Sequence, residues 1–193
     1  MDFNIVILFI GWCMYGLVHS VLATTAIKKF ANNVGIKLGA YKVIYNIIAV
    51  VGLYALIKFQ TTITSVKLFS TTMLVTVISL FLTAAGFAIM LICIFRYFKQ
   101  MNGFSQEVNQ PTLIISGLHR FVRHPLYTGT FIFIAGLFFL FPFMANLVSI
   151  SVIIAYTLIA IRFEERKLIL TFGEDYISYQ KRVPKILPDF WKR

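Results

Sequence analysis

The sequence predicts an all-α protein that crosses a membrane several times. Of its 193 residues, 59% are hydrophobic and only 13% are charged, and the mean hydropathy is +0.84. A soluble domain needs about a quarter of its residues charged to cover its surface. The chain instead contains five apolar segments, each near the roughly 17 to 25 residues that a helix needs to cross a hydrocarbon core of about 30 Å. These observations predict a polytopic helical membrane protein.

We predict five transmembrane helices, at residues 3–27, 43–59, 73–95, 125–141 and 147–161. The first is expected to be retained rather than cleaved as a signal peptide, because Asp2 stands where Lys or Arg would be expected and His19 interrupts the apolar run. Pro142 and few polar residues separate the last two segments, which predicts a tight antiparallel hairpin. No internal repeat or linker is visible, so residues 1–193 are predicted to form a single integral-membrane domain.

The cations fall almost entirely on one side of this predicted topology. Sixteen of the eighteen Lys and Arg residues follow the first, third or fifth segment, and only Lys58 and Lys67 fall on the other side. Because cytoplasmic loops carry the excess of Lys and Arg, we expect the N-terminus outside and the C-terminus in the cytoplasm. The net charge of +11 is then a topology signal and an attraction for membrane lipid. Nucleic acid is not an expected partner, since no basic groove motif accompanies the charge.

Charged and hydrogen-bonding residues gather at both cytoplasmic ends of the predicted hairpin. Arg123, His124 and Tyr127 lie at the start of its first helix, and Glu164 and Glu165 follow its second helix. An antiparallel hairpin brings these two groups together. Polar groups at a membrane are costly unless they have a function. The combination therefore indicates an active site that faces the cytoplasm.

The sequence around Pro125 predicts a helix N-terminus beside two basic side chains. The proline ring disfavours a helical conformation at His124 and suits the first turn of the helix that follows. Backbone N–H groups at such an end favour an anion, and Arg123 would hold a carboxylate through two parallel hydrogen bonds. An alternative of equal weight is that Arg123 anchors the helix by binding lipid phosphate.

The adjacent acids Glu164 and Glu165 point about 100° apart on a helix, so they do not share one environment. One is expected to form a surface ion pair with Arg162 or Arg166, and the other to face the mouth of the hairpin, where it would suit a sulfonium or ammonium cation. Aromatic faces for the same cation, or for an interfacial belt of tyrosines, are supplied by Tyr127, Tyr176 and Tyr179.

The residues after Glu165 predict a cap over the hairpin. The helix should continue out of the bilayer and stop at Gly173. A second helix is expected after it, with Glu174 and Asp175 in the first turn, where the helix dipole favours acids, and with Pro184 at its end. This segment is predicted to fold back as a cytoplasmic helical cap.

Small residues within the predicted spans indicate close packing. Gly129 and Gly136 are seven residues apart on one helix face and would let another backbone approach; lining a cofactor cleft is the alternative. Cys13 and Cys93 form no CxxC pair, so no zinc site is indicated. Both are expected to be buried as small apolar residues.

The order and spacing of these motifs resemble the C-terminal signature of the isoprenylcysteine carboxyl methyltransferase (ICMT)-like superfamily, over roughly residues 113–188. The resemblance is carried by Gly117-Leu118-His119-Arg120-Phe121-Val122-Arg123-His124-Pro125-Leu126-Tyr127-Thr128-Gly129, by Glu164-Glu165, by Phe172-Gly173-Glu174-Asp175-Tyr176 and Tyr179, and by Lys181-Arg182-Val183-Pro184. In the N-terminal half, His19-Ser20-Val21-Leu22-Ala23 and Tyr45-Asn46 resemble its NnrU-like and methanethiol S-methyltransferase branches.

The resemblance implies an integral-membrane enzyme that uses S-adenosyl-L-methionine, enclosed between the hairpin and the cap within residues 113–188. The cofactor-binding residues that it implies are His119, Arg123, His124, Pro125, Tyr127, Glu165 and Tyr176. The catalytic residues that it implies are Glu164, Glu165 and Arg182, and it implies no metal. His119 departs from the pattern, since relatives often have Tyr there, which would change a stacking partner of the cofactor.

The residues leave the methyl acceptor open. A small or lipophilic thiol is favoured by the branch resemblance, and the carboxylate of an isoprenylcysteine or another lipophilic acid is the alternative. A hypothesis of another class is a non-methylating NnrU-like membrane protein that binds haem through His19 and either His119 or His124. A scaffold without catalysis is least favoured. The short chain and the branch resemblance favour a bacterial inner membrane, and the sequence does not indicate an oligomeric state.

Overall fold

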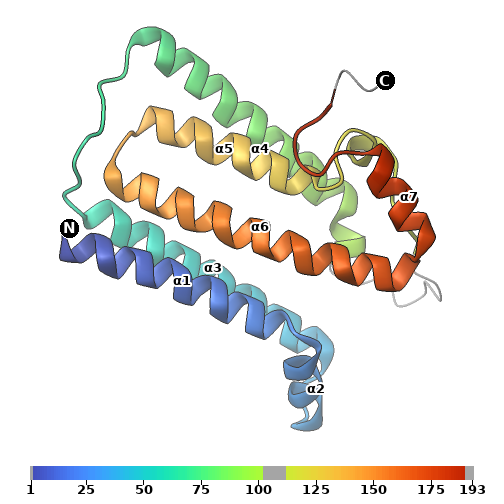
Figure 1. Ribbon diagram of the computed structural model, residues 1–193. Helices are drawn as coiled ribbons and strands as arrows, with labels where there is room; N and C mark the ends of the chain where they lie inside the picture. The colour runs from blue at the N-terminus through green and yellow to red at the C-terminus, as the bar shows by residue number, and fades with distance from the viewer. Residues whose placement is uncertain (1, 102–111, 190–193) are drawn as a thin grey trace. The chain divides into compact units, whose positions relative to one another are not determined.

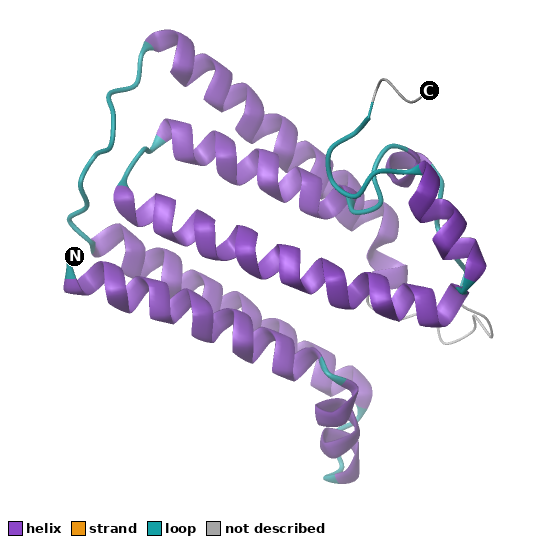
Figure 2. Cartoon of the chain, viewed as in Figure 1, coloured by secondary structure: helices purple, strands orange, loops and turns teal. Residues whose placement is uncertain are grey.

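The computed structural model describes residues 2–101 and 112–189 of the chain (Figure 1). In this part of the chain, the backbone forms helices joined by loops (Figure 2), which confirms the predicted all-α class. The helices are α1 (Phe3–Ala23), α2 (Thr25–Asn33), α3 (Leu38–Thr62), α4 (Met73–Met101), the short 3₁₀ helix η1 (Gly117–Arg120), α5 (Pro125–Leu140), α6 (Met144–Phe172) and α7 (Glu174–Arg182). The sequence between residues 96 and 123 contains turn signals such as Asn102-Gly103 and Ser116-Gly117, which predict a cytoplasmic loop. Residues 102–111 of this segment lie outside the described residues.

Four helices of the described chain are long and apolar enough to cross a membrane, namely α1, α3, α4 and α6. They coincide with four of the five predicted spans. The remaining predicted span is α5, an apolar helix of 16 residues. At about 1.5 Å per residue it is about 24 Å long, shorter than a typical hydrocarbon core of about 30 Å.

The first predicted span ended at residue 27, but α1 ends at Ala23. Thr24 explains the difference, because it is in an extended conformation and its hydroxyl accepts a hydrogen bond from the N–H of Ile27 at 3.4 Å. This is an N-cap, so a new helix, α2, begins at Thr25. At the other end of α1, Asp2 caps the helix by accepting a bond from the N–H of Asn4 at 3.1 Å.

The described residues divide into two compact units. The first comprises Met1–Phe69 and Pro142–Tyr156, and the second Ser70–Phe141 and Thr157–Arg193, so that α6 contributes to both. The core of the first unit is formed by Ile5, Leu8, Trp12, Ile63 and Ala145. Gln60 of α3 adds polar contacts in this unit, because it bonds Asn146 and accepts a bond from the hydroxyl of Ser149 at 2.6 Å.

In the second unit, α4 and α5 pack through glycines. A Cβ atom added at Gly129 would lie 3.0 Å from the carbonyl oxygen of Gly86, and one added at Gly136 would lie 2.6 Å from the backbone nitrogen of Thr83. The two backbones therefore approach more closely than any larger residue allows. This supports helix packing, rather than the lining of a cleft, as the role of Gly129 and Gly136.

The two cysteines differ in their surroundings. Cys93 on α4 is buried, as predicted, whereas Cys13 on α1 is exposed, so the prediction of burial was wrong for Cys13. The reason is helical periodicity, since α1 turns Leu8, Trp12 and Gly16 inward and a residue next to Trp12 points about 100° away from that face.

Candidate active site

Helix α7 forms the predicted cap on the second unit (Figure 1, red). Gly173 separates it from α6 with φ of +53°, a left-handed conformation that favours glycine. Glu174 and Asp175 occupy the first turn of α7, and the helix ends at Arg182. The prediction of a second helix between Gly173 and Pro184 is therefore confirmed.

The segment after α7 lies along the residues that precede α5. The N–H of Arg123 donates to the carbonyl oxygen of Pro184 at 2.8 Å, and the N–H of His124 donates to that of Lys185 at 3.1 Å. The hydroxyl of Thr128 also donates to the carbonyl oxygen of Ile186 at 2.7 Å. These bonds hold the C-terminal segment over the beginning of α5.

Glu165, near the end of α6, is the centre of a buried charge cluster and is only 8% exposed. Its Oε1 lies 2.8 Å from Nε and 2.7 Å from Nη2 of Arg123, and 3.2 Å from Nε2 of His124. Its Oε2 lies 3.2 Å from Nζ of Lys185. A buried carboxylate without partners would be strongly unfavourable, and here two cations and an imidazole compensate it. We call Arg123, His124, Glu165 and Lys185 the charge cluster.

Arg123 also binds the cap. Its Nη1 donates to the carbonyl oxygens of Gln180 at 3.1 Å and Val183 at 2.6 Å. The fixed fork of the guanidinium group thus joins α6 to the end of α7. The carboxylate that Arg123 holds in the structure is that of Glu165, and its predicted contact with a cofactor stays a prediction.

The two adjacent acids have different environments, as expected from the helix geometry. Glu165 faces the charge cluster, whereas the side chain of Glu164 is 45% exposed and its Oε2 lies 3.7 Å from Nδ1 of His124. The His124 ring is buried and stacks on Tyr127, with 5.7 Å between the ring centroids. Pro125 is buried as the first residue of α5. Among the described residues, the ionisable partner of Glu164 is therefore His124 rather than the predicted Arg162 or Arg166.

His119, on η1, is held by the cap and by the charge cluster. The hydroxyl of Tyr179 donates to its carbonyl oxygen at 2.6 Å, and its Nδ1 lies 3.1 Å from the carbonyl oxygen of Arg123. Because a carbonyl oxygen only accepts, Nδ1 carries the proton in this bond. Burial lowers the pKa of His119, and the nearby His124 lowers it further. Together they outweigh the hydrogen bond to the carbonyl oxygen of Arg123, which raises this pKa. The ring is therefore neutral at pH 7.

Tyr176, on α7, is only 1% exposed. Among the described residues, its hydroxyl is the one buried side-chain hydroxyl without a hydrogen-bond partner. Burial and the negative charge of Glu165 raise the pKa of this phenol above its usual range, so it remains protonated. An unsatisfied buried hydroxyl costs about 1–3 kcal/mol. It is therefore a hydrogen-bond donor left unsatisfied in the described part of the chain.

Arg182, predicted to be catalytic, does not join the charge cluster. It is exposed, and its Nε donates to the carbonyl oxygen of Ser178 within α7 at 3.3 Å. Lys185 instead provides the second cation beside Glu165, a role that the sequence motifs did not indicate. Its position directly after Pro184 was the available signal, since the predicted cap had to return the chain toward Arg123.

Comparison with known proteins identifies the family. Residues 72–175, more than half of the chain, match the family of phospholipid methyltransferases. The chain belongs to this family, and the matched region includes α4, α5, α6 and both acids of the site. The methyltransferase superfamily predicted from the motifs is thereby confirmed.

The relatives whose sequences match part of this chain are named methyltransferases. Methanethiol S-methyltransferase of Crocosphaera subtropica is 40% identical over 77 residues, which are 39% of this chain and 29% of that protein. Methanethiol S-methyltransferase 1 of Bradyrhizobium diazoefficiens is 37% identical over 90 residues, covering 46% and 30%. Protein-S-isoprenylcysteine O-methyltransferase of Xenopus laevis is 34% identical over 91 residues, covering 44% and 30%. The chain thus spans under a third of each relative, and no solved structure matches it.

Proposed function

We propose that this protein is an integral-membrane methyltransferase that uses S-adenosyl-L-methionine to methylate a small or lipophilic thiol. The observation that carries the proposal is the charge cluster beneath the cap, next to the unpartnered hydroxyl of Tyr176. Family membership and the names of the thiol-methylating relatives support the same chemistry. Composition and the apolar helices support a membrane location.

The residues beneath the cap fit the proposed cofactor. Its planar base would stack on an aromatic face such as the His124–Tyr127 pair, and the hydroxyl of Tyr176 would donate to one of its acceptors. The exposed carboxylate of Glu164 would attract its cationic groups. His119 and Pro125 would line the same cofactor site. When bound, S-adenosyl-L-methionine supplies a methyl group that its sulfonium sulfur has already activated.

The charge cluster would position these groups and favour an ionised acceptor. Arg123 and Lys185 hold Glu165 in place, so Glu165 would act as a fixed anion rather than as a proton donor. The attacking form of a thiol is the thiolate, and a nearby cation stabilises it. Lys185, with a side chain 41% exposed, is the cation of the cluster that an acceptor would reach. Arg182 would serve only after a rotation away from Ser178.

The orientation follows from the charges. We propose that the cluster faces the cytoplasm, because sixteen of the eighteen cations fall on that side of the predicted topology. We propose a bacterial inner membrane because the sequence resembles the methanethiol S-methyltransferase branch, whose relatives here come from Crocosphaera and Bradyrhizobium. The cofactor is polar, so a site that opens to an aqueous compartment suits it. A lipophilic acceptor would arrive from the bilayer.

A second acceptor class is favoured by one observation. The relatives named isoprenylcysteine O-methyltransferase are 34–35% identical over 91 residues, close to the identity of the thiol-methylating relatives. A lipophilic carboxylate is therefore the alternative acceptor. It is already ionised at neutral pH and would not need Lys185 for activation.

Cofactor binding tests the proposal. Calorimetry in nanodiscs should detect S-adenosyl-L-methionine binding, and Tyr176→Phe should weaken it about tenfold, the loss of one hydrogen bond. Tyr54→Phe is the matched control, because Tyr54 is 62% exposed on α3 and should leave binding unchanged. Absence of binding by the folded protein would refute the proposal, and a Soret absorption band would favour the haem hypothesis instead.

A further inference from the structure

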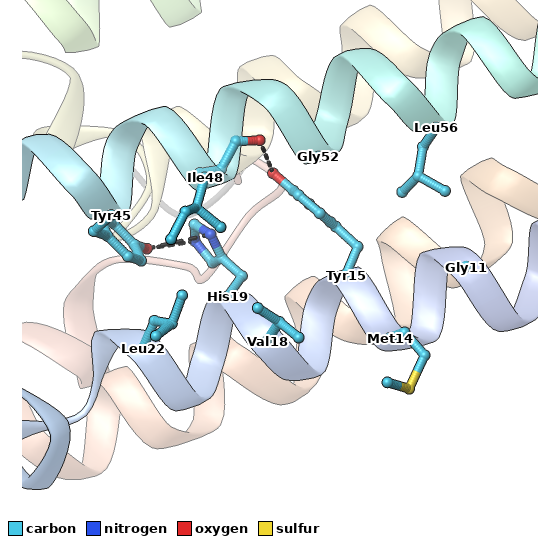
Figure 3. A pocket seen from close by; sticks show the side chains of 11 residues that line it. Gly11, Met14, Tyr15, Val18, His19, Leu22, Tyr45, Ile48, Gly52 and Leu56 are labelled. Carbon is cyan, nitrogen blue, oxygen red and sulfur yellow. Dashed lines mark hydrogen bonds between the residues drawn. The ribbon is translucent and has the colours of Figure 1, made fainter.

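The first unit contains a cavity of about 280 Å³ between α1 and α3 (Figure 3). It is lined by Gly11, Met14, Tyr15, Val18, His19, Leu22, Tyr45, Ile48, Ala49, Gly52 and Leu56. All of these residues precede the region that matches the family, residues 72–175, and the cavity shares no residue with the charge cluster. Gly11 and Gly52 let the side chains of Leu56 and Tyr15 on the opposite helix approach closely, since a Cβ atom there would lie 2.8 Å and 3.2 Å from them.

The polar groups of the cavity lie at one place. His19 on α1 and Tyr45 on α3 point toward one another across it (Figure 3), with the Tyr45 hydroxyl 2.8 Å from Nε2 and 3.2 Å from Nδ1 of His19. The hydrogen-bonding directions of the two ring nitrogens diverge, so one hydroxyl satisfies only one of them. The other nitrogen retains the capacity to bond a ligand.

The pair is held in a fixed position. Tyr15 stacks on the His19 ring with 5.9 Å between centroids, and its hydroxyl donates to the carbonyl oxygen of Ala49 at 3.1 Å. A Cβ atom at Gly52 would lie 3.2 Å from the Tyr15 ring, so glycine there allows Tyr15 to reach α3. The polar end of the cavity is therefore built by both helices.

We infer that this cavity binds a small lipophilic molecule with a neutral hydrogen-bonding head group, such as a hydroxyl. The head would bond the His19–Tyr45 pair, and the hydrocarbon would lie along Met14, Val18 and Leu56. None of the lining residues is Lys, Arg, Asp or Glu, so a charged head would lack a counter-ion. The volume of about 280 Å³ is many times what one water molecule needs, so it suits a small organic molecule.

Photolabelling in lipid nanodiscs tests the inference with a diazirine-bearing octanol as the probe. Peptide mass spectrometry should find saturable labelling on α1 and α3, which excess octanol suppresses. A diazirine-bearing octane without the hydroxyl should label these helices about tenfold less, because it forms no hydrogen bond to the pair. Equal labelling by both probes, or labelling that does not saturate, would overturn the inference.

Variants locate the site. Val18→Phe should fill the cavity and reduce saturable labelling about tenfold. Val21→Phe is its matched control, because Val21 lies on the same helix with 45% exposure against 42% for Val18 and does not line the cavity. His19→Phe should reduce labelling as Val18→Phe does, whereas His19→Gln, which keeps a hydrogen-bonding group, should restore part of it. Unchanged labelling in Val18→Phe and His19→Phe would contradict the inference.

Discussion

Replacing Glu165 by glutamine removes the negative charge from the centre of the charge cluster and keeps the shape of the side chain. Arg123 and Lys185 would then lose their counter-ion. The loss is costly because the side chains of Arg123 and Glu165 are each only 10% exposed. Since Arg123 also binds the carbonyl oxygens of Gln180 and Val183, the docking of the cap should weaken.

The expected magnitude follows from the burial of the pair. Breaking a buried ion pair costs about 3–5 kcal/mol when one charge is left without a partner. Glutamine still accepts one hydrogen bond through its amide oxygen, so we take the lower end, about 3 kcal/mol. This corresponds to about a hundredfold larger population of the undocked cap, at about 1.4 kcal/mol for each factor of ten.

Hydrogen exchange measured by mass spectrometry in nanodiscs reports this population. Peptides covering residues 174–186 should lose protection about a hundredfold in Glu165→Gln. Glu164→Gln is the matched control, since the neighbouring acid has a 45% exposed side chain and its exposed ion pairing contributes little. Equal protection in the two variants would refute the reasoning that Glu165 holds the cap.

Three further predictions concern single positions. Tyr176→Phe should leave the unliganded protein at least as stable as the parent in thermal unfolding, because it removes a buried hydroxyl that has no partner in the described residues; a clear loss of stability would contradict this. Because the pKa of His119 is lowered in the folded protein, the free energy of unfolding should be highest above pH 6.5, the ordinary pKa of histidine, and should fall as the pH is lowered below it. His119→Asn should flatten this pH dependence between about pH 7.5 and 5. Gly136→Ala should destabilise the protein by about 1–3 kcal/mol through overpacking against Thr83, whereas Gly39→Ala, with open space around it, should not.

The sequence was sufficient for the start of α5 and for the cap because local signals set them. Pro125 begins α5, Gly173 provides the left-handed turn into α7, and Arg123, just before α5, contacts Glu165 in the later part of α6. Charge and spacing therefore predicted that these two residues lie together, and their roles in catalysis and cofactor binding stay predictions. They also predicted that the two adjacent acids would face different environments, without deciding which of them faces the site.

The remaining features depend on tertiary contacts that spacing does not determine. Lys185 reaches Glu165, and Arg182 does not, because backbone bonds fix the segment after α7 against Arg123 and His124. The hydrogen bonds from Arg123 to the carbonyl oxygens of Gln180 and Val183 depend on where α7 ends. The cavity beside His19 arises from the packing of α1 on α3, which an apolar sequence pattern leaves open.

Transfer of a labelled methyl group tests the central claim most directly. The protein in nanodiscs should be incubated with methyl-labelled S-adenosyl-L-methionine and a panel of small thiols, prenylated cysteines and fatty acids. We expect the label on a thiol, and its loss in Arg123→Ala but not in Arg162→Ala, a matched change of an exposed residue on α6. A folded protein that binds the cofactor yet labels no acceptor, or equal transfer by the two variants, would contradict the account.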